Sequence, residues 1–144
     1  MEREGTQVLG EASVFEEIGP QECLELVGSG GVGRIAFCSE GESYIFPVNY
    51  VRDGSTIAFR TDTDTHLFKT ALSRIAFEVD GTDPMNQVGW SVLLRGTGRL
   101  MTEAVDELSK HIESLDLVPW VPGDNAEWIR IIHPDISGRR ITRA

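Results

Sequence analysis

The stretch Ser43–Thr61, Ser-Tyr-Ile-Phe-Pro-Val-Asn-Tyr-Val-Arg-Asp-Gly-Ser-Thr-Ile-Ala-Phe-Arg-Thr, decides the fold of this chain. Two runs rich in aromatic and β-branched residues lie on either side of Asp53-Gly54. Asp-Gly between such runs predicts a β-hairpin, because both central residues of a type I′ turn need a positive φ. We therefore expect two antiparallel strands, Ser43–Val51 and Thr56–Thr61.

Further strands are predicted on both sides of this hairpin. Their ranges are Gly33–Cys38 before it and Arg74–Asp80, Val88–Met101 and Glu127–His133 after it. Gly96 and Gly98 interrupt the long Val88–Met101 run, which indicates a bend of the kind that closes a barrel. The pattern predicts a mainly β protein, an antiparallel six-stranded, Greek-key-like barrel with α decoration.

Three helices are expected around the strands. The first opens at Gly19-Pro20 and ends at Gly28, the second covers Thr65–Leu72, and the third follows Thr102 with an apolar stripe at Val105, Leu108, Ile112 and Leu115. Residues 1–14 are polar and aperiodic, which predicts an N-terminal tail, and residues 15–144 are expected to form a single domain.

The charge balance excludes several classes of partner. The chain has 144 residues with 23 acidic and 13 basic side chains, a formal net charge of −10. Nucleic acid and anionic membrane are therefore not expected as partners, because both require a basic surface. No apolar run approaches the ~20 residues of a membrane span, and the N-terminus lacks a signal peptide pattern. Cys23 and Cys38 are expected to be buried free thiols, so the sequence predicts a cytoplasmic protein.

Three motifs invite a functional interpretation and are better explained structurally. Gly28-Ser-Gly-Gly-Val-Gly33 matches G-x-G-x-x-G, but the predicted order is helix, glycines, strand, opposite to a dinucleotide site. The histidines are scattered over three elements, so no metal site is predicted. Glu78 and Asp80 share one strand face, and we expect that face to be solvated.

The strand end at Arg60 and Thr61 carries the clearest chemical signal. Lys69 follows on the next predicted helix, and threonines lie between them. A forked guanidinium, a point-charge ammonium and hydroxyl groups are the groups that hold a phosphate monoester. In an acidic chain, this cluster predicts a site for one small anion.

The order of these features resembles the pyridoxamine 5′-phosphate oxidase-like superfamily over about Glu16 to Ile141. The segments that carry the resemblance are Tyr44–Tyr50, Ile57–Thr61, Lys69, Ile75–Asp80 and Gly89–Gly96. The family implies a split β-barrel that binds FMN in a groove at the interface of a homodimer.

The resemblance also implies roles for individual residues. Pro47, Val48 and Asn49 match the strand that runs along the flavin ring, largely through main-chain groups. Arg60, Thr61 and Lys69 match the groups that hold the FMN phosphate and ribityl chain. Trp90, Ser91 and Val92 match the strand that approaches the ring, commonly from the other subunit.

The implied function is an FMN-dependent oxidoreductase acting on an unassigned small-molecule substrate, with no nameable catalytic side chain. The C-terminal segment Gly138-Arg-Arg-Ile-Thr-Arg-Ala lacks the Arg-rich substrate motif of true pyridoxamine 5′-phosphate oxidases, so that activity is not expected. The short actinobacterial-type members are more similar. Two alternatives remain open: an F420-dependent reductase on the same fold, and a non-catalytic flavin- or haem-binding module.

Overall fold

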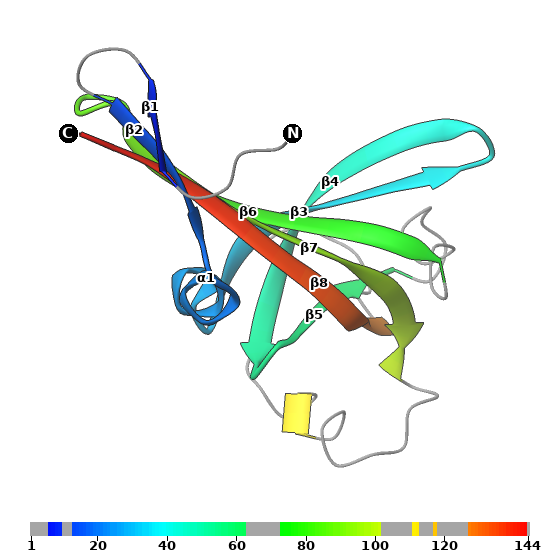
Figure 1. Ribbon diagram of the computed structural model, residues 1–144. Coiled ribbons are helices and arrows are strands. Elements are labelled where there is room, and N and C mark those ends of the chain that lie inside the picture. The colour runs from blue at the N-terminus through cyan, green and yellow to red at the C-terminus, as the bar shows by residue number, and fades with distance from the viewer. Residues whose placement is uncertain are drawn as a thin grey trace.

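The computed structural model describes residues 6–9, 13–62, 73–101, 111–112, 117 and 127–143. Figure 1 shows the helix α1 and long, twisted strands. In chain order they are β1 (Thr6–Leu9), β2 (Ser13–Ile18), α1 (Pro20–Val27), β3 (Gly30–Ser39), β4 (Glu42–Asp53), β5 (Thr56–Thr61), β6 (Arg74–Asp83), β7 (Val88–Leu100) and β8 (Glu127–Arg143).

Six of these strands close into an antiparallel ring. The order around it is β3, β4, β5, β8, β7, β6 and back to β3. This confirms the predicted fold class, a six-stranded antiparallel barrel. β1 and β2 extend the sheet beyond the ring, because β2 pairs with the C-terminal part of β8.

The predicted hairpin is present, and a second one joins β3 to β4, but the turn at Asp53-Gly54 differs from the expectation. β4 and β5 are joined at Asp53↔Thr56, so the loop residues are Gly54 and Ser55. Gly54 alone has a positive φ, 61°, as a type II′ turn requires at its first position. The type I′ pattern lies instead between β3 and β4, where Glu40 and Gly41 have φ values of 52° and 80°.

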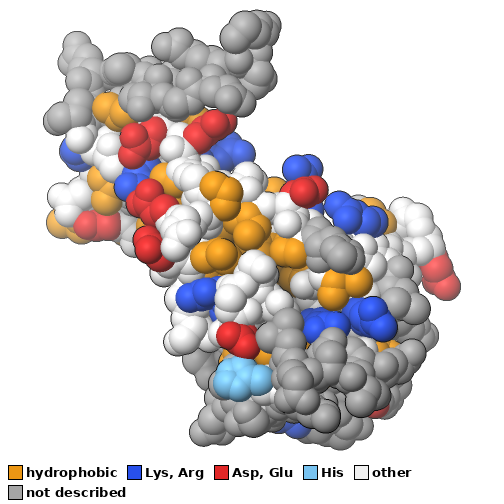
Figure 2. Space-filling view, turned by 60° about the horizontal axis from the view of Figure 1, so that its bottom comes forward, with side chains coloured by type: hydrophobic (Ala, Val, Ile, Leu, Met, Phe, Trp, Pro, Cys, Tyr) orange, Lys and Arg blue, Asp and Glu red, His pale blue; other side chains and the backbone are white. Residues whose placement is uncertain are grey.

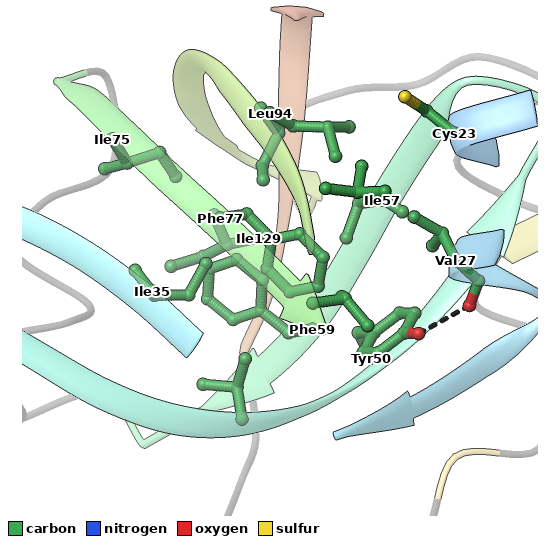
Figure 3. Close-up of a cluster of buried hydrophobic side chains, with 14 of the residues drawn as sticks. Cys23, Val27, Ile35, Tyr50, Ile57, Phe59, Ile75, Phe77, Leu94 and Ile129 are labelled. Carbon is green, nitrogen blue, oxygen red and sulfur yellow. Dashed lines mark hydrogen bonds between the residues drawn. The ribbon is translucent and has the colours of Figure 1, made fainter. Parts of the chain in front are cut away.

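The barrel interior is an apolar core built from alternate strand positions. Ile35, Phe59, Phe77 and Leu94 have no exposed surface. The Tyr50 ring meets the Phe77 ring edge-on, with centroids 5.0 Å apart. Figure 3 shows these side chains converging from different strands, so the core ties distant segments together.

Helix α1 closes one end of the barrel. Its Cys23 and Val27 are 0% and 3% exposed, and the Tyr50 hydroxyl donates a 2.6 Å hydrogen bond to the Val27 carbonyl (Figure 3). Pro20 begins the helix, and Gly28, at φ 71°, ends it by donating to the Leu24 carbonyl. The glycine-rich motif is thus a helix C-cap and a strand entry, as predicted.

A β-bulge bends the barrel where Gly96 was expected to do so. The register shifts between Arg95↔Asp135 and Thr97↔Ile132, so His133 and Pro134 together oppose Gly96. A methyl group on Gly96 would lie 2.7 Å from the Ile131 side chain and the Ile132 carbonyl oxygen. Proline is accommodated here because a bulge removes the need for its N–H.

The structure corrects three expectations. Part of the predicted tail forms strands, since residues 6–9 are β1 and β2 begins at Ser13. The last strand continues to Arg143 rather than ending at His133, because β7 and β2 provide pairing partners far away in sequence. Cys38 is an exposed free cysteine on the hairpin arm, where its strand leaves the core.

Two predicted helices fall mainly outside the described residues. Those are the helix over Thr65–Leu72, which carries Lys69, and the helix after Thr102, of which residues 111–112 are described as helical. Ile112 is fully buried, packed in a second apolar cluster with Val51, Ala58 and Met101.

Substitution of Gly96 by Ala tests the bulge. We expect a loss of about 1–3 kcal/mol in the free energy of unfolding, because the new methyl meets a backbone oxygen that cannot move cheaply. Urea denaturation measures the loss. The control is Gly19→Ala, where nothing lies within 4 Å of the added methyl. Equal effects of the two substitutions would contradict this role of Gly96.

Candidate functional site

The outward-facing positions of β3 and β4 form a continuous surface. Pro47 is exposed and Asn49 is half-buried, whereas Val48, between them, is 8% exposed and packs in the core. Pro47 lies opposite Arg34, and Asn49 lies opposite Val32. Residues directly opposite in an antiparallel pair share a face, so these four side chains form one surface, here called the outer strip.

The strand beneath the outer strip has one unpaired edge. β4 pairs with β3 from Glu42 to Val51 but with β5 only from Tyr50 onward. The segment before Tyr50 therefore has a strand partner on one side only among the described residues. Main-chain groups along a strand edge of this kind are the groups with which an elongated ligand pairs, although Pro47 itself has no N–H to donate. This fits the predicted main-chain role of Pro47, Val48 and Asn49.

Arg60 extends the same face at the end of β5. The last β4–β5 pair is Tyr50↔Phe59, and Asn49 and Arg60 are the next residues beyond it. The Arg60 guanidinium lies over the Trp128 ring, 5.6 Å from its centroid, and donates a 3.5 Å hydrogen bond to the Leu117 carbonyl. These contacts hold a fixed positive charge at one end of the outer strip.

Thr61 points away from Arg60. Its side chain is 5% exposed, and its hydroxyl donates a 3.5 Å hydrogen bond to the Asp62 carbonyl. Adjacent strand residues face opposite sides of a sheet, so Thr61 meets an outer-face ligand through main-chain groups at most. Lys69, the third member of the predicted phosphate cluster, lies outside the described residues.

Trp90, Ser91 and Val92 lie at the far end of the same chain. β8 pairs with Arg60 through Trp128 and with Trp90 through Arg140. Twelve positions of β8 separate these points, roughly 40 Å of extended strand. Figure 1 shows β8 running from β5 to the β1–β2 end of the molecule. Arg60 and Trp90 of one chain therefore lie far apart along β8, whereas Ser91 lies opposite Asp80, which forms an ion pair with Arg34 of the outer strip.

The three β7 residues also face different ways. Val92 has no exposed surface and belongs to the barrel core. Trp90 packs against the same side, where it lines a groove of about 530 Å³ with Glu22, Leu26 and Arg140. Ser91 occupies the alternate position and faces outward, opposite Arg139.

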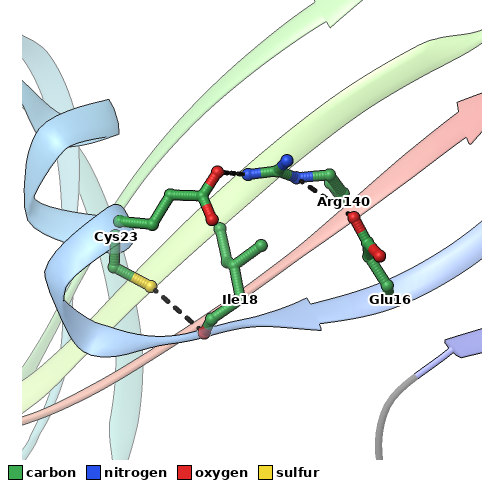
Figure 4. A network of polar contacts seen from close by, with 5 residues as sticks. Glu16, Ile18, Cys23 and Arg140 are labelled. Carbon is green, nitrogen blue, oxygen red and sulfur yellow. Dashed lines mark hydrogen bonds and ion pairs between the residues drawn. The ribbon is translucent and has the colours of Figure 1, made fainter.

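The Trp90 groove is bounded by an arginine that carboxylates already neutralise. Arg140 forms ion pairs with Glu22 of α1 and with Glu16 of β2, and Figure 4 shows Arg140 reaching toward Glu16 beside Cys23. The Cys23 thiol beside this network donates a 3.6 Å hydrogen bond to the Ile18 carbonyl. Burial raises the pKa of the Cys23 thiol, so this cysteine is protonated at neutral pH.

A charged cluster lies one strand away from Pro47. Arg34 forms an ion pair with Glu78 at 3.0 Å and a second with Asp80 at 3.7 Å. The pKa of Glu78 is raised, first by its burial and then by the neighbouring Asp80 carboxylate, while Arg34 acts in the opposite direction. The solvated carboxylate pair expected from the sequence is thus a three-residue network at the edge of the outer strip.

Sequence reasoning missed two side chains of this surface. Arg34 and Trp128 become relevant only through pairing with Pro47, Glu78 and Arg60. Alternation along the Gly33–Cys38 run places Arg34 outward, but nothing in that run indicates what lies opposite. The described residues contain no group of three His, Cys, Asp or Glu side chains that could hold a metal ion.

Exposed apolar side chains are unevenly distributed. Figure 2 shows hydrophobic side chains gathered near the middle of one face, with arginine side chains beside them. Val32 of the outer strip is 37% exposed, and Ile45, two residues before Pro47, is 66% exposed. None of the described helices is long and apolar enough to cross a membrane.

The pyridoxamine 5′-phosphate oxidase family model matches residues 19–140. The chain belongs to this family. The match spans the elements from the start of α1 to the C-terminal part of β8, and thus all strands of the ring. A search of curated proteins found no match.

Several solved structures share the fold. The FAD binding protein from Mycobacterium smegmatis is 32% identical, with a TM-score of 0.73 and coverage of 89% of this chain and 98% of that one. A conserved protein of unknown function from Corynebacterium diphtheriae is 31% identical, with a TM-score of 0.69 and coverage of 87% and 96%. An FAD-binding protein from Mesorhizobium loti, 20% identical, has a TM-score of 0.65 and covers 88% and 97%. These neighbours confirm the split-barrel architecture.

The charged cluster makes a prediction about Glu78. Replacing Arg34 by Gln raises the Glu78 pKa further, because the opposing cation is lost, whereas Asp80→Asn lowers it. Carboxyl-carbon NMR titration of each variant measures the pKa directly. If both variants moved the pKa in the same direction, the assigned causes would be wrong.

The same shift predicts a pH dependence of stability. Because the pKa of Glu78 is higher in the folded than in the unfolded protein, its protonated form stabilises the fold. This contribution is fully present below the ordinary pKa of 4.5 and is lost as the pH rises through the pKa of the folded state. Relative to wild type, Glu78→Gln should therefore change the free energy of unfolding more favourably at about pH 7, where Glu78 is charged, than at about pH 4, where it is protonated. Urea unfolding of wild type and variant at the two pH values tests this, and a pH-independent difference would contradict it.

Proposed function

We propose that this protein is a flavin-binding oxidoreductase that holds FMN on the outer strip and acts as a homodimer in the cytoplasm. One observation carries the proposal: a β4 segment that pairs with a strand on one side only, among the described residues, lies directly beside Arg60 in a chain of the pyridoxamine 5′-phosphate oxidase family. The similar protein from M. smegmatis, named as an FAD binding protein, supports a flavin ligand.

The described residues fit such a ligand. The β4 segment at Pro47–Asn49 would present main-chain groups along the flavin ring. Arg60, already oriented by Trp128, would hold the phosphate together with Thr61 main-chain groups and Lys69. Thr61 keeps its buried orientation and limits movement of the strand end. The flavin itself supplies the hydride or electron transfer, so no catalytic acid or base is required from the chain.

A second copy would complete the site. Trp90 lies roughly 40 Å along β8 from the strand position paired with Arg60, so we place the partner's Trp90 and Ser91 at the ring, as the family resemblance implies. A two-fold symmetric dimer creates two such composite sites, each using Arg60 from one chain and Trp90 from the other. The exposed Val32 on the outer strip is suited to burial in that interface.

Oxidation of pyridoxamine 5′-phosphate is not proposed. Arg140 is paired with Glu16 and Glu22, and the Arg139 guanidinium lies 5.6 Å from the centroid of the Phe15 ring. Neither arginine is placed as an open receptor for a substrate phosphate. The proposal therefore leaves the substrate as a small molecule of another class.

FAD is the second candidate cofactor, because the 32% identical M. smegmatis protein is named for it. F420 is the third candidate cofactor. If the protein binds a flavin that is neither oxidised nor reduced in turnover, it would be a flavin carrier or sensor and not an enzyme. Mass spectrometry of the ligand released from purified, heat-denatured protein distinguishes these candidates. A colourless protein that no flavin stabilises against thermal unfolding would overturn the proposal.

Arg60→Ala tests the phosphate end. We expect flavin affinity to fall about 10- to 100-fold, because a charge-assisted hydrogen bond contributes about 1.5–3 kcal/mol. Flavin titration by fluorescence quenching measures the change. Arg143→Ala, an exposed arginine at the end of β8, is the matched control and should bind normally. Equal affinity of Arg60→Ala and wild type would remove Arg60 from the site.

Mixing two defective variants tests the composite site. Arg60→Ala and Trp90→Ala should each bind flavin poorly when pure, because each lacks one half of both sites. Co-refolded in equal amounts, about half of the dimers are mixed, and about a quarter of all sites regain both residues. Recovery of tight flavin binding upon mixing is the expected result. No recovery despite proven mixed dimers would show that one chain forms the whole site.

A further inference from the structure

A shallow trough crosses four strands beside the outer strip. Ile45 of β4 lies opposite Ala36 of β3, Ala36 opposite Ala76 of β6, and Ala76 opposite Arg95 of β7. All four side chains therefore share the outer face. The two alanines form a low floor, with the larger Ile45 and Arg95 side chains at either end.

The trough deepens where β3 leaves β6. Pairing between these strands covers only Arg34–Ala36 with Glu78–Ala76, and beyond it the β3–β4 hairpin extends away from the barrel (Figure 1). Phe37 and Tyr44 line the opening from the other face of the hairpin, where the Phe37 ring is buried and stacks on the half-buried Tyr44 ring with centroids 5.3 Å apart. The hollow has a volume of about 730 Å³. A flat apolar body could be covered on two sides there.

Two arginines line this hollow without a side-chain partner among the described residues. Arg74 and Arg95 are both exposed and line it, and neither guanidinium makes a hydrogen bond or ion pair with any described residue. No Asp or Glu of the described residues lines the hollow. Asp135, opposite Arg95 on β8, makes no ion pair with it. By contrast, Arg34 and Arg140 are each held by two carboxylates.

We propose that this trough binds a small organic anion. Its flat apolar body would lie over Ala36 and Ala76 against Ile45, and its carboxylate or phosphate would meet Arg74 and Arg95. Charge complementarity selects this occupant, because two guanidiniums that no described carboxylate neutralises favour an anion over a neutral molecule.

The position of the trough indicates a use for it. Ile45 is two residues from Pro47 on the same face, about 7 Å along β4. An anion in the trough would lie at the end of the outer strip opposite Arg60, where a substrate could approach a bound ring. That role as substrate site rests on the proposed flavin function, whereas binding of the anion does not.

Three probes of one shape test the trough: naphthyl phosphate, naphthoate and the neutral naphthylmethanol. Binding to isotope-labelled full-length protein is followed by NMR, with and without added flavin. The two anions should perturb the amide signals of Ala36 and Ala76 and bind more weakly as salt is raised. Comparing the affinities of naphthyl phosphate and naphthoate shows which of the two headgroups the trough prefers. Binding of naphthylmethanol as tightly as the anions would overturn the proposal.

Variants separate this site from the flavin site. Arg74→Gln and Arg95→Gln should each weaken anion binding about tenfold, while Arg99→Gln, an exposed arginine further along β7, is the matched control. Loss of flavin binding in Arg60→Ala with intact naphthyl phosphate binding would show that the two sites are independent. The proposal would fail if no anion bound the wild-type protein while Arg74→Gln and Arg95→Gln converted a dimer to a monomer in sedimentation. The trough would then be a dimer interface between two copies of this chain.

Discussion

The pairing of β8 with partners on both sides is the constraint on which the rest of the structure depends. One side of β8 pairs with β7 over nearly its whole length, from Ile129 to Ile141, and its other side pairs first with β5 and at its end with β2. This one strand closes the ring and also carries the sheet beyond it. Because β8 is long and extended, it separates Arg60 from Trp90 by most of the length of the molecule. The need for a second copy in the proposed flavin site is therefore a consequence of how the barrel closes.

Strict alternation along the strands then divides the predicted site residues by face. Pro47, Asn49 and Arg60 face outward, whereas Val48, Thr61 and Val92 are buried. A site on this surface combines outward side chains with main-chain groups of the inward residues. The trough on the outer face has a similar origin. Because β3 pairs with β6 over only a few residues, the β3–β4 hairpin leaves the barrel there and opens the trough.

The sequence allowed most of the fold to be predicted. Local signals were sufficient for α1, with Pro20 at its start and Gly28 at its end, and for the strands joined by tight turns. Gly96 correctly indicated a bend, because only a residue without a side chain fits beside Ile131 there. The extension of β8 past Pro134 was not predictable, since the bulge that accommodates this proline exists only in the pairing with β7. The same holds for β1 and β2.

The sequence by itself determined the fold class, the family and the chemical types that could hold a cofactor, because these depend on periodicity, turn residues and the order of motifs along the chain. The tertiary structure decided which of those residues meet. It places the Arg60 guanidinium over the Trp128 ring and pairs Arg34 with Glu78 and Asp80. It also brings Arg74 and Arg95 together at a hollow that no described carboxylate lines. Such neighbours arise from strand register between segments distant in sequence, and register is set by closure of the whole barrel rather than by any local stretch.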